Sequence, residues 1–313
     1  MRSNCGFLLI LLLTLITPNS AYKCRFVDEI HYKCKVYPDR FRNQERHLQN
    51  KGTDDVRQVW IDGNLNIISH LTESILPVCQ RFQNLQELHI IDGIKSVDKN
   101  FIKNCRILKH FWIQGTEIAE IPENFFKENS KLVKLELQVN KLMALPENIF
   151  KNQAELQELN LYDNQINFFP PKLFHPLKKL RFLWLNKNQI QTLKPVWFEN
   201  LHSLERLALN DNDISDLPRN MFNSLENLEF LWLDGNRLTT IHSDSFGIHQ
   251  KFNEIDLKSN KIYGIDEKFI WHTTVKKILM GYGTVCCQEE VTERNQMNET
   301  LSECFRNYKP RLG

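Results

Sequence analysis

The stretch "LRFLWLNKNQI", residues 180–190, decides the fold because it returns at a fixed interval along the chain. Regular copies start 24 residues apart, at positions 132, 156, 180, 204, 228 and 252, and less regular copies start at 56, 85, 108 and 275. They share the frame L-x-x-L-x-L-x-x-N-x-L. A constant period of this length is the signature of a stacked repeat architecture.

Each copy predicts one short strand whose leucines point to the same side. One copy cannot bury those leucines alone, whereas stacked copies bury them in a continuous core and pair their strands in parallel. The frame resembles the extracellular leucine-rich repeat family over about residues 56–285. We therefore expect an α/β-type repeat solenoid, a curved leucine-rich repeat horseshoe with a parallel concave sheet and Cys-containing caps at both ends.

Two further columns support this register. The ninth position of the regular copies carries an asparagine, whose amide can bond backbone groups of neighbouring turns: Asn140, Asn164, Asn188, Asn212, Asn236 and Asn260. Six residues before most copies stands a phenylalanine that we expect to fill the convex side: Phe126, Phe150, Phe174, Phe198, Phe222, Phe246 and Phe269.

Position five of each copy lies on the sheet face opposite the core leucines, and four of the six tryptophans fall there: Trp60, Trp112, Trp184 and Trp232. Phe182 and Phe230 stand beside two of them at position three, and Arg206 lies on the strand between. Two strand spacings separate Trp184 from Trp232 by about 10 Å, which predicts an aromatic trough with Ala208 as its floor.

An exposed apolar patch marks a contact site, and Trp and Arg dominate binding energies. We interpret this aromatic group as a partner-binding site on the concave face. The alternative is that the rings only shelter the hydrogen bonds of the strands.

A second group lies nearer the N-terminus. His89 and His110 fall on the same face as Trp60 and Trp112, together with Glu87. Two histidines and a carboxylate could hold a metal or make binding pH-sensitive. The pattern favours a polar, solvated patch that contributes to partner binding, and we predict neither a metal nor a cofactor.

The N-terminal segment has the composition of an export signal. Arg2 precedes the apolar run "FLLILLLTLI" at 7–16, and the small residues Ser20 and Ala21 follow. The run is too short to span a bilayer, which indicates a secretory signal peptide over residues 1–21. No later segment has a comparable run, so we expect a secreted, extracellular protein without a membrane anchor.

The charge balance excludes one class of partner. The net charge is +2, and removal of Arg2 with the signal peptide lowers it by one, to +1. Counterion release from nucleic acid requires a basic excess that this chain lacks, so no nucleic-acid partner is expected.

Eight cysteines include Cys5, which leaves with the signal peptide, so seven remain in an oxidising compartment. Cys24 and Cys34 are expected to close a hairpin-like cap over residues 22–55. Cys79 and Cys105 occupy consensus core positions and fit either buried thiols or a disulfide.

At the other end, one of Cys286 and Cys287 is expected to bond Cys304 in a cap over residues 286–313. The spare thiol could join a partner covalently, or it could be buried and unreactive. The only N-glycosylation sequon, at Asn298, lies in the same cap and leaves the sheet face free of sugar.

A signal peptide, about ten repeats, a short N-terminal Cys pair and a "CC…C" cap resemble the mosquito leucine-rich immune proteins. That resemblance implies secretion into haemolymph and complement-like defence against parasites and bacteria. Longer members of that family carry a coiled coil after the cap and form disulfide-linked dimers that bind thioester proteins. Only nine residues follow Cys304 here, without heptads, which corresponds to a coil-less form.

We therefore expect a non-enzymatic innate-immune factor that binds an extracellular protein or a microbial surface. The alternative is a soluble adhesion or developmental signalling ligand that uses the same surface. Catalysis is not expected, because the chain has no Gly-rich phosphate loop, and its scattered histidines, His175, His242 and His272, have no nucleophile at fixed spacing.

Overall fold

The computed structural model describes residues 57–62, 70–71, 79, 82–247, 251–272, 274–281 and 301–309, together with the strands at 20–26 and 31–38. Residues 20–26, 31–38, 61–62, 70–71 and 270–272 are described by their backbone alone. The chain forms two compact units. Unit 1 comprises Met1–Leu142 with Lys151–Gln153, and unit 2 comprises Met143–Phe150 with Ala154–Gly313.

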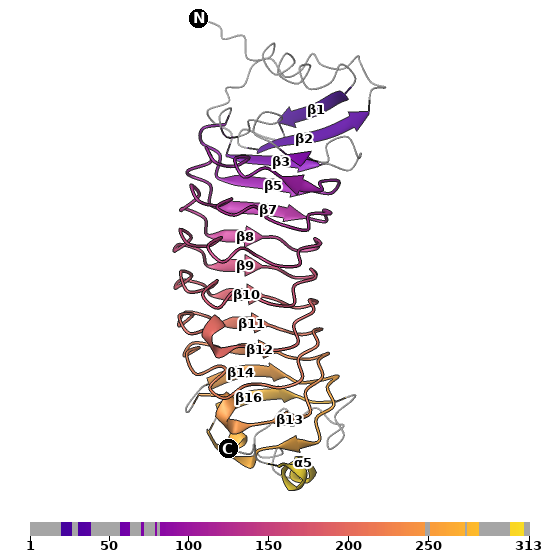
Figure 1. The fold of residues 1–313 in the computed structure, drawn as a ribbon, viewed down its shortest axis with the longest axis vertical. Coiled ribbons are helices and arrows are strands. Elements are labelled where there is room, and N and C mark those ends of the chain that lie inside the picture. Colours follow the sequence, from indigo (N-terminus) through magenta and orange to yellow (C-terminus); the bar gives the residue numbers. More distant parts are fainter. Residues whose placement is uncertain are drawn as a thin grey trace, which may run out of the picture. The chain divides into compact units, whose positions relative to one another are not determined.

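Unit 1 is a stack of strands in the order β1-β2-β3-β5-β7-β8 (Figure 1). Only β1 and β2 pair antiparallel, and the later neighbours pair parallel. A short two-stranded sheet joins β4 to β6. The bounds are β1 (Ser20–Phe26), β2 (His31–Pro38), β3 (Gln58–Asp62), β4 (His70–Leu71), β5 (Glu87–Ile91), β6 (Ser96–Val97), β7 (His110–Gln114) and β8 (Lys134–Glu136).

Unit 2 repeats the pattern with six parallel strands in the order β9-β10-β11-β12-β14-β16, and β13 pairs with β15 beside them. Its strands are β9 (Glu158–Asn160), β10 (Phe182–Trp184), β11 (Arg206–Ala208), β12 (Phe230–Trp232), β13 (Thr240–Ile241), β14 (Lys251–Asp256), β15 (Gly264–Ile265) and β16 (Thr274–Leu279). Its helices are the 3-10 helices η2 (Pro195–Trp197) and η3 (Ser243–Ser245) and the α-helices α3 (Glu267–His272) and α5 (Ser302–Asn307).

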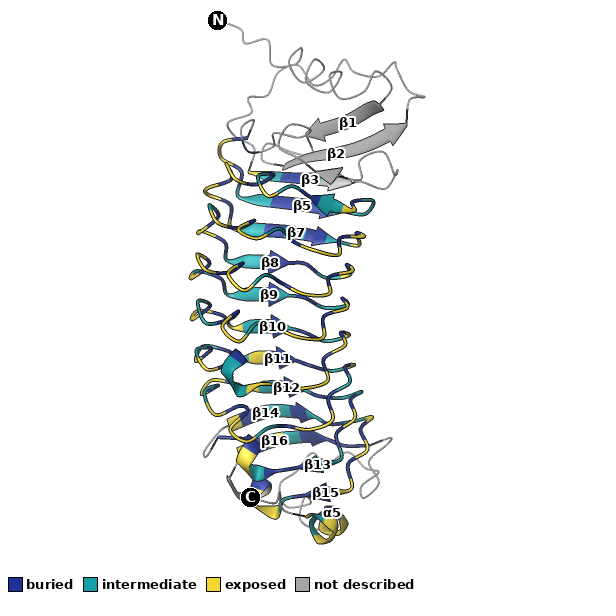
Figure 2. Cartoon of the chain, in the orientation of Figure 1, coloured by how far each residue is buried: buried dark blue, intermediate teal, exposed yellow. Residues whose placement is uncertain are grey.

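Every predicted copy supplies a strand at positions three to five, and the strands align with a 24-residue shift in the regular part, as in Leu159, Leu183, Leu207 and Leu231. These leucines are 0% exposed. Figure 2 shows that the exposed residues lie mostly in the connecting segments, whereas the strands are mainly buried or half-buried. The parallel-sheet leucine-rich repeat solenoid predicted from the sequence is confirmed.

The asparagine column forms the predicted ladder. In unit 2, Nδ2 of Asn188 donates to the carbonyl of Leu185 in its own copy (3.1 Å) and of Leu161 in the copy before (2.9 Å). Its Oδ1 accepts from the amide of Ile166 (3.0 Å). The same bonds recur one copy later at Asn212. Each amide thus joins two turns where regular sheet pairing stops.

The phenylalanine column is buried as predicted. In unit 2 the rings follow one another, with centroids 6.4 Å apart for Phe150 and Phe174 and 4.6 Å apart for Phe246 and Phe269. Trp197 also belongs to this core, because it is 1% exposed and its Nε1 donates to the carbonyl of Phe169 (3.0 Å). The sequence frame did not identify that role.

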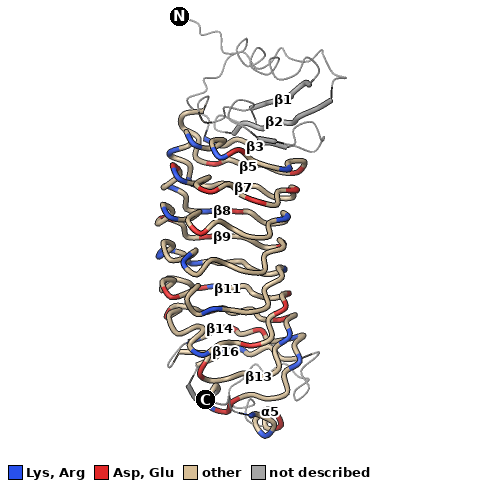
Figure 3. Tube along the Cα trace, viewed as in Figure 1, with Lys and Arg blue, Asp and Glu red and all other residues tan. Residues whose placement is uncertain are grey.

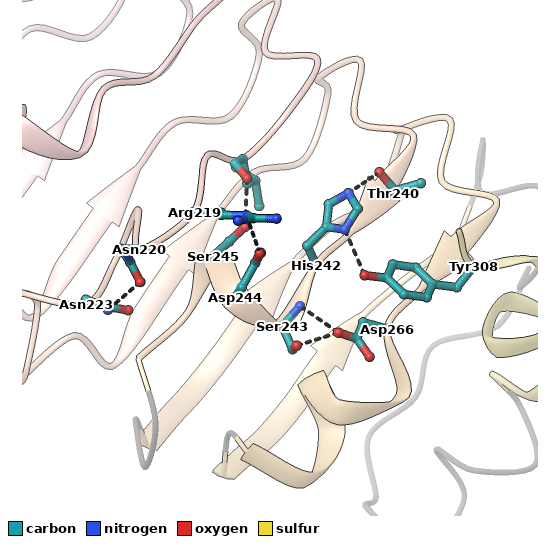
Figure 4. A network of polar contacts seen from close by, with 11 residues as sticks. Arg219, Asn220, Asn223, Thr240, His242, Ser243, Asp244, Ser245, Asp266 and Tyr308 are labelled. Atoms are coloured by element: carbon teal, nitrogen blue, oxygen red, sulfur yellow. Dashed lines mark hydrogen bonds and ion pairs between the residues drawn. The ribbon is translucent and has the colours of Figure 1, made fainter. Parts of the chain in front are cut away.

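The C-terminal helix α5 lies beside β15. Tyr308, which follows α5 directly, belongs to a polar network that Figure 4 shows from close by. Nδ1 of His242 lies 2.9 Å from the hydroxyl of Tyr308, and its Nε2 lies 2.9 Å from Oγ1 of Thr240. Gly264 permits this approach, because a Cβ there would lie 2.9 Å from the Cα of Tyr308. His242 therefore has a structural role in unit 2, where it joins Thr240 to Tyr308.

Candidate functional site

The open face, the sheet face opposite the core leucines, carries two rows of side chains across β10, β11 and β12. The backbone register places Arg206 between Phe182 and Phe230, and Ala208 between Trp184 and Trp232. Leu183, Leu207 and Leu231 separate the rows and point into the core. The five residues Phe182, Trp184, Arg206, Phe230 and Trp232, called here the aromatic group, therefore lie together on this face of unit 2.

The tryptophans of the aromatic group do not form the predicted trough. Their ring centroids are 5.7 Å apart with an interplanar angle of 13°, so the indoles lean together and stack. Ala208 beneath them is only 1% exposed. The expectation of an open channel with Ala208 as its floor is wrong, because stacking removes more ring surface from water than two separate walls would. The resulting surface is a half-buried aromatic platform.

Arg206 lies at the other row of the aromatic group. Its Cζ is 5.2 Å from the ring centroid of Phe182 and 5.0 Å from that of Phe230. Guanidinium groups at such distances from aromatic faces are held by cation–π attraction. Next to it, Trp232 donates its Nε1 proton to Oε1 of Glu254 (3.1 Å), which fixes the orientation of that indole.

Unit 1 carries a second cluster on its open face. The imidazole of His89 lies between two indoles, with centroids 3.7 Å from Trp60 at 5° and 3.9 Å from Trp112 at 8°. His89 is 7% exposed. The interpretation of this region as a solvated patch is therefore wrong for His89, because both flat faces of its ring are covered.

The polar edge of this cluster is built around Glu87. Its Oε1 lies 3.1 Å from Nδ1 of His110, and its other oxygen accepts a hydrogen bond from Gln58. Nε2 of Gln58 also donates to Nε2 of His89 (3.1 Å), which suits a neutral imidazole. Burial lowers the pKa of His89 from 6.5 to about 4, and the nearby carboxylate of Glu87 offsets part of that shift.

The free energy of unfolding should therefore decrease as the pH is lowered, because of His89. The unfolded chain binds a proton near pH 6.5, whereas the folded chain resists it down to about pH 4. The contribution is present above pH 6.5 and is lost as the pH falls toward 4, which amounts to about 2 kcal/mol between pH 7 and pH 5. Urea denaturation at both pH values measures this difference.

His89→Phe keeps an uncharged ring in the stack and should remove about 2 kcal/mol of the pH-dependent loss. His202→Gln is the matched control, because the His202 side chain is 55% exposed. An equal pH-dependent loss in wild type and His89→Phe would contradict the assignment to His89.

Among the residues that the structure describes, no group of three His, Cys, Asp or Glu side chains is arranged to hold a metal ion. An acidic pair not predicted from the sequence lies in unit 2. Burial raises the pKa of Asp234 to about 6, with a further contribution from the charge of Asp256. The two aspartates occupy positions seven and five of adjacent copies, a pattern that the 24-residue register could have indicated.

An open polar groove of about 520 Å³ lies beside the aromatic group, lined by Gln157, Lys179, Arg181, Ser203, Glu205, Asn227 and Glu229. Both cations that line it are paired with carboxylates. Lys179 pairs with Glu155 (2.7 Å), and Arg181 makes two bonds to Glu205 (2.7 and 2.9 Å). Figure 3 shows the same mixing of both signs along the turns of each unit.

The structure describes the predicted cysteine pairs to different extents. Cys79 and Cys105 form a disulfide in unit 1, with Cα atoms 5.0 Å apart. The backbone register sets Cys24 opposite Cys34 in the β1–β2 hairpin. Cys304, which lies on α5, is disulfide-bonded. Its candidate partners Cys286 and Cys287, like Asn298, lie outside the described residues.

Comparisons with known proteins agree with this architecture. Residues 130–190 and 183–238 match the leucine rich repeat family model. No curated protein sequence matches the chain. Within the described residues, no helix is both long and apolar enough to span a bilayer.

Three solved structures share the fold, each over 74% of this chain. A leucine-rich repeat protein of Leptospira interrogans has 24% identity and a TM-score of 0.62, and 55% of its length is covered. The Drosophila Toll–Spätzle complex has 19% identity and a TM-score of 0.64, with 35% covered. A complex of TLR13 with single-stranded RNA has 19% identity and a TM-score of 0.57, with 37% covered. The chain thus spans between about a third and just over half of these proteins, and the likeness shows the fold alone.

Proposed function

We propose that this chain is a secreted, non-enzymatic recognition module of innate immunity, of the complement-like kind, that binds an extracellular protein or a microbial surface through its open face. The apolar segment at 7–16 supports export. The aromatic group is the observation that carries the proposal. Its four rings are half-buried and Arg206 is exposed, so they form a platform that a partner can cover.

Two of the solved structures that share the fold are complexes with a ligand. Toll belongs to a complex with the protein Spätzle that is described as a hub in development and innate immunity. The TLR13 structure holds RNA. A protein or surface partner suits the present chain better than RNA, because its net charge is only +2 and its charges are mixed.

A second candidate function is a soluble adhesion or developmental signalling ligand. The description of the Toll–Spätzle complex names development beside immunity, which supports this second function. Expression in blood cells or fat body with induction on infection supports the immune role. Neural or epithelial expression supports the developmental one.

Affinity capture from native extracellular fluid tests the binding surface. The double variant Trp184→Ala/Trp232→Ala removes the stacked indoles and should lower retention of the partner at least about tenfold, since buried aromatic anchors dominate interface energies. Phe168→Ala is the matched control, because Phe168 is a 43% exposed aromatic of unit 2 outside the strands. Capture with and without reductant also tests covalent pairing through the spare cysteine of Cys286 and Cys287.

Retention should be unchanged in Phe168→Ala. Equal retention by the double variant, with an unchanged circular dichroism spectrum, would rule out the aromatic group as the contact site.

A further inference from the structure

We propose that Arg206 is the receptor for a single carboxylate, an aspartate or glutamate side chain of an extended segment of the protein partner. This inference rests on the proposed function and specifies the chemistry that the aromatic group recognises. It predicts a partner motif in which an acidic residue stands two positions from an apolar one.

The geometry around Arg206 prepares a carboxylate site. Phe182 and Phe230 flank its guanidinium at similar distances, 5.2 and 5.0 Å from Cζ. A guanidinium held over aromatic rings still presents its N–H groups in its own plane, where a carboxylate binds with two parallel bonds. Because the side chain is exposed, that edge is accessible to a partner.

Arg206 also differs from Lys134 and Lys277, the two lysines at position three of the open face. Lys134 pairs with Glu136 (2.7 Å), and Lys277 pairs with Glu254 (3.2 Å). The guanidinium of Arg206 makes neither an ion pair nor a hydrogen bond with any residue that the structure describes. Its charge is therefore available for an acceptor from outside the chain.

The surroundings of Arg206 favour one carboxylate over a polyanion. In the strand register, Glu158 lies beyond Phe182 and Glu254 lies beyond Phe230. Sulfated or phosphorylated polymers place many charges in a row and would meet these carboxylates on both sides. A lone acidic side chain between apolar neighbours meets only the arginine.

The stacked indoles determine the second half of the motif. Arg206 and Ala208, over which Trp184 and Trp232 close, are two residues apart on β11. In an extended peptide, side chains two positions apart project to the same side, about 6.7 Å from each other. A peptide lying along β11 can therefore place an acid on Arg206 and an apolar side chain on the indoles.

The test uses a phage-displayed library of random peptides selected on the intact chain, followed by calorimetry with the most enriched synthetic peptide. We expect the enriched peptides to share an acidic residue two positions from an apolar one. Arg206→Gln should weaken binding by about tenfold or more, the loss typical of a charge-assisted hydrogen-bonded pair. Changing the peptide acid to its amide should do the same, and combining both changes should cost little more than either.

Lys194→Gln is the matched control. It removes another cation held over an aromatic ring, 4.7 Å from Phe168, and should leave affinity unchanged. Enriched peptides that lack an acid, or that bind Arg206→Gln as tightly as wild type, would overturn the inference. So would retention on heparin that Arg206→Gln abolishes.

The two proposals fail in different ways. Peptides that lose affinity for Trp184→Ala/Trp232→Ala but not for Arg206→Gln leave the binding surface standing and refute the carboxylate receptor. Absence of any enriched peptide on the wild-type chain contradicts both.

Discussion

Trp197→Ala should lower the free energy of unfolding by about 5 kcal/mol, because it empties a fully buried site and leaves a carbonyl without its donor. Trp197 is 1% exposed and its indole contacts the ring of Phe169 edge-on, with centroids 5.3 Å apart. The alanine cannot replace the bond from Nε1 to the carbonyl of Phe169 (3.0 Å). Urea denaturation followed by circular dichroism measures the loss.

The control for that loss is another tryptophan. Trp184→Ala removes an indole of the same size from the open face, where it is half-exposed and packs against Trp232. We expect a cost of only about 1–2 kcal/mol there, mainly from the lost aromatic pair. Equal losses at both positions would mean that the open-face indoles serve folding as much as the core does, which would weaken their assignment to binding.

The repeat period predicted the strands and the faces of their side chains. A strand alternates its side chains regardless of what they are, so Trp184 had to lie opposite Leu183 once the register was known. The asparagine and phenylalanine columns followed for the same reason. Each is fixed by a backbone position that recurs every 24 residues.

Side-chain packing on the open face could not be predicted in this way. The rotamers that bring Trp184 and Trp232 together depend on the small residue between them, Ala208, and on the bond that holds Trp232 to Glu254. The burial of His89 likewise requires two flat rings from the neighbouring strands. These are contacts between three or more copies, whereas the sequence frame treats each copy alone.

The ladder asparagines join those copies. Asn212→Ala should therefore lower the free energy of unfolding of unit 2. Asn212 is 7% exposed. Its Oδ1 accepts from the amide of Ile190 (3.0 Å), and its Nδ2 donates to the carbonyls of Leu185 and Leu209 (3.0 Å each). The carbonyls keep a second donor from neighbouring asparagines, whereas the buried amide of Ile190 loses its acceptor.

Together these losses should lower the free energy of unfolding by about 4 kcal/mol. Asn212→Asp separates hydrogen bonding from packing, because the carboxylate fills the same volume but cannot donate to the two carbonyls. Asn223→Ala is the control, since Asn223 is exposed and its side-chain amide donates to Oδ1 of Asn220 (2.9 Å) rather than joining two copies. If Asn212→Asp retains wild-type stability at pH 7, the ladder amides contribute volume rather than hydrogen bonds, and the turns must be joined by leucine packing alone.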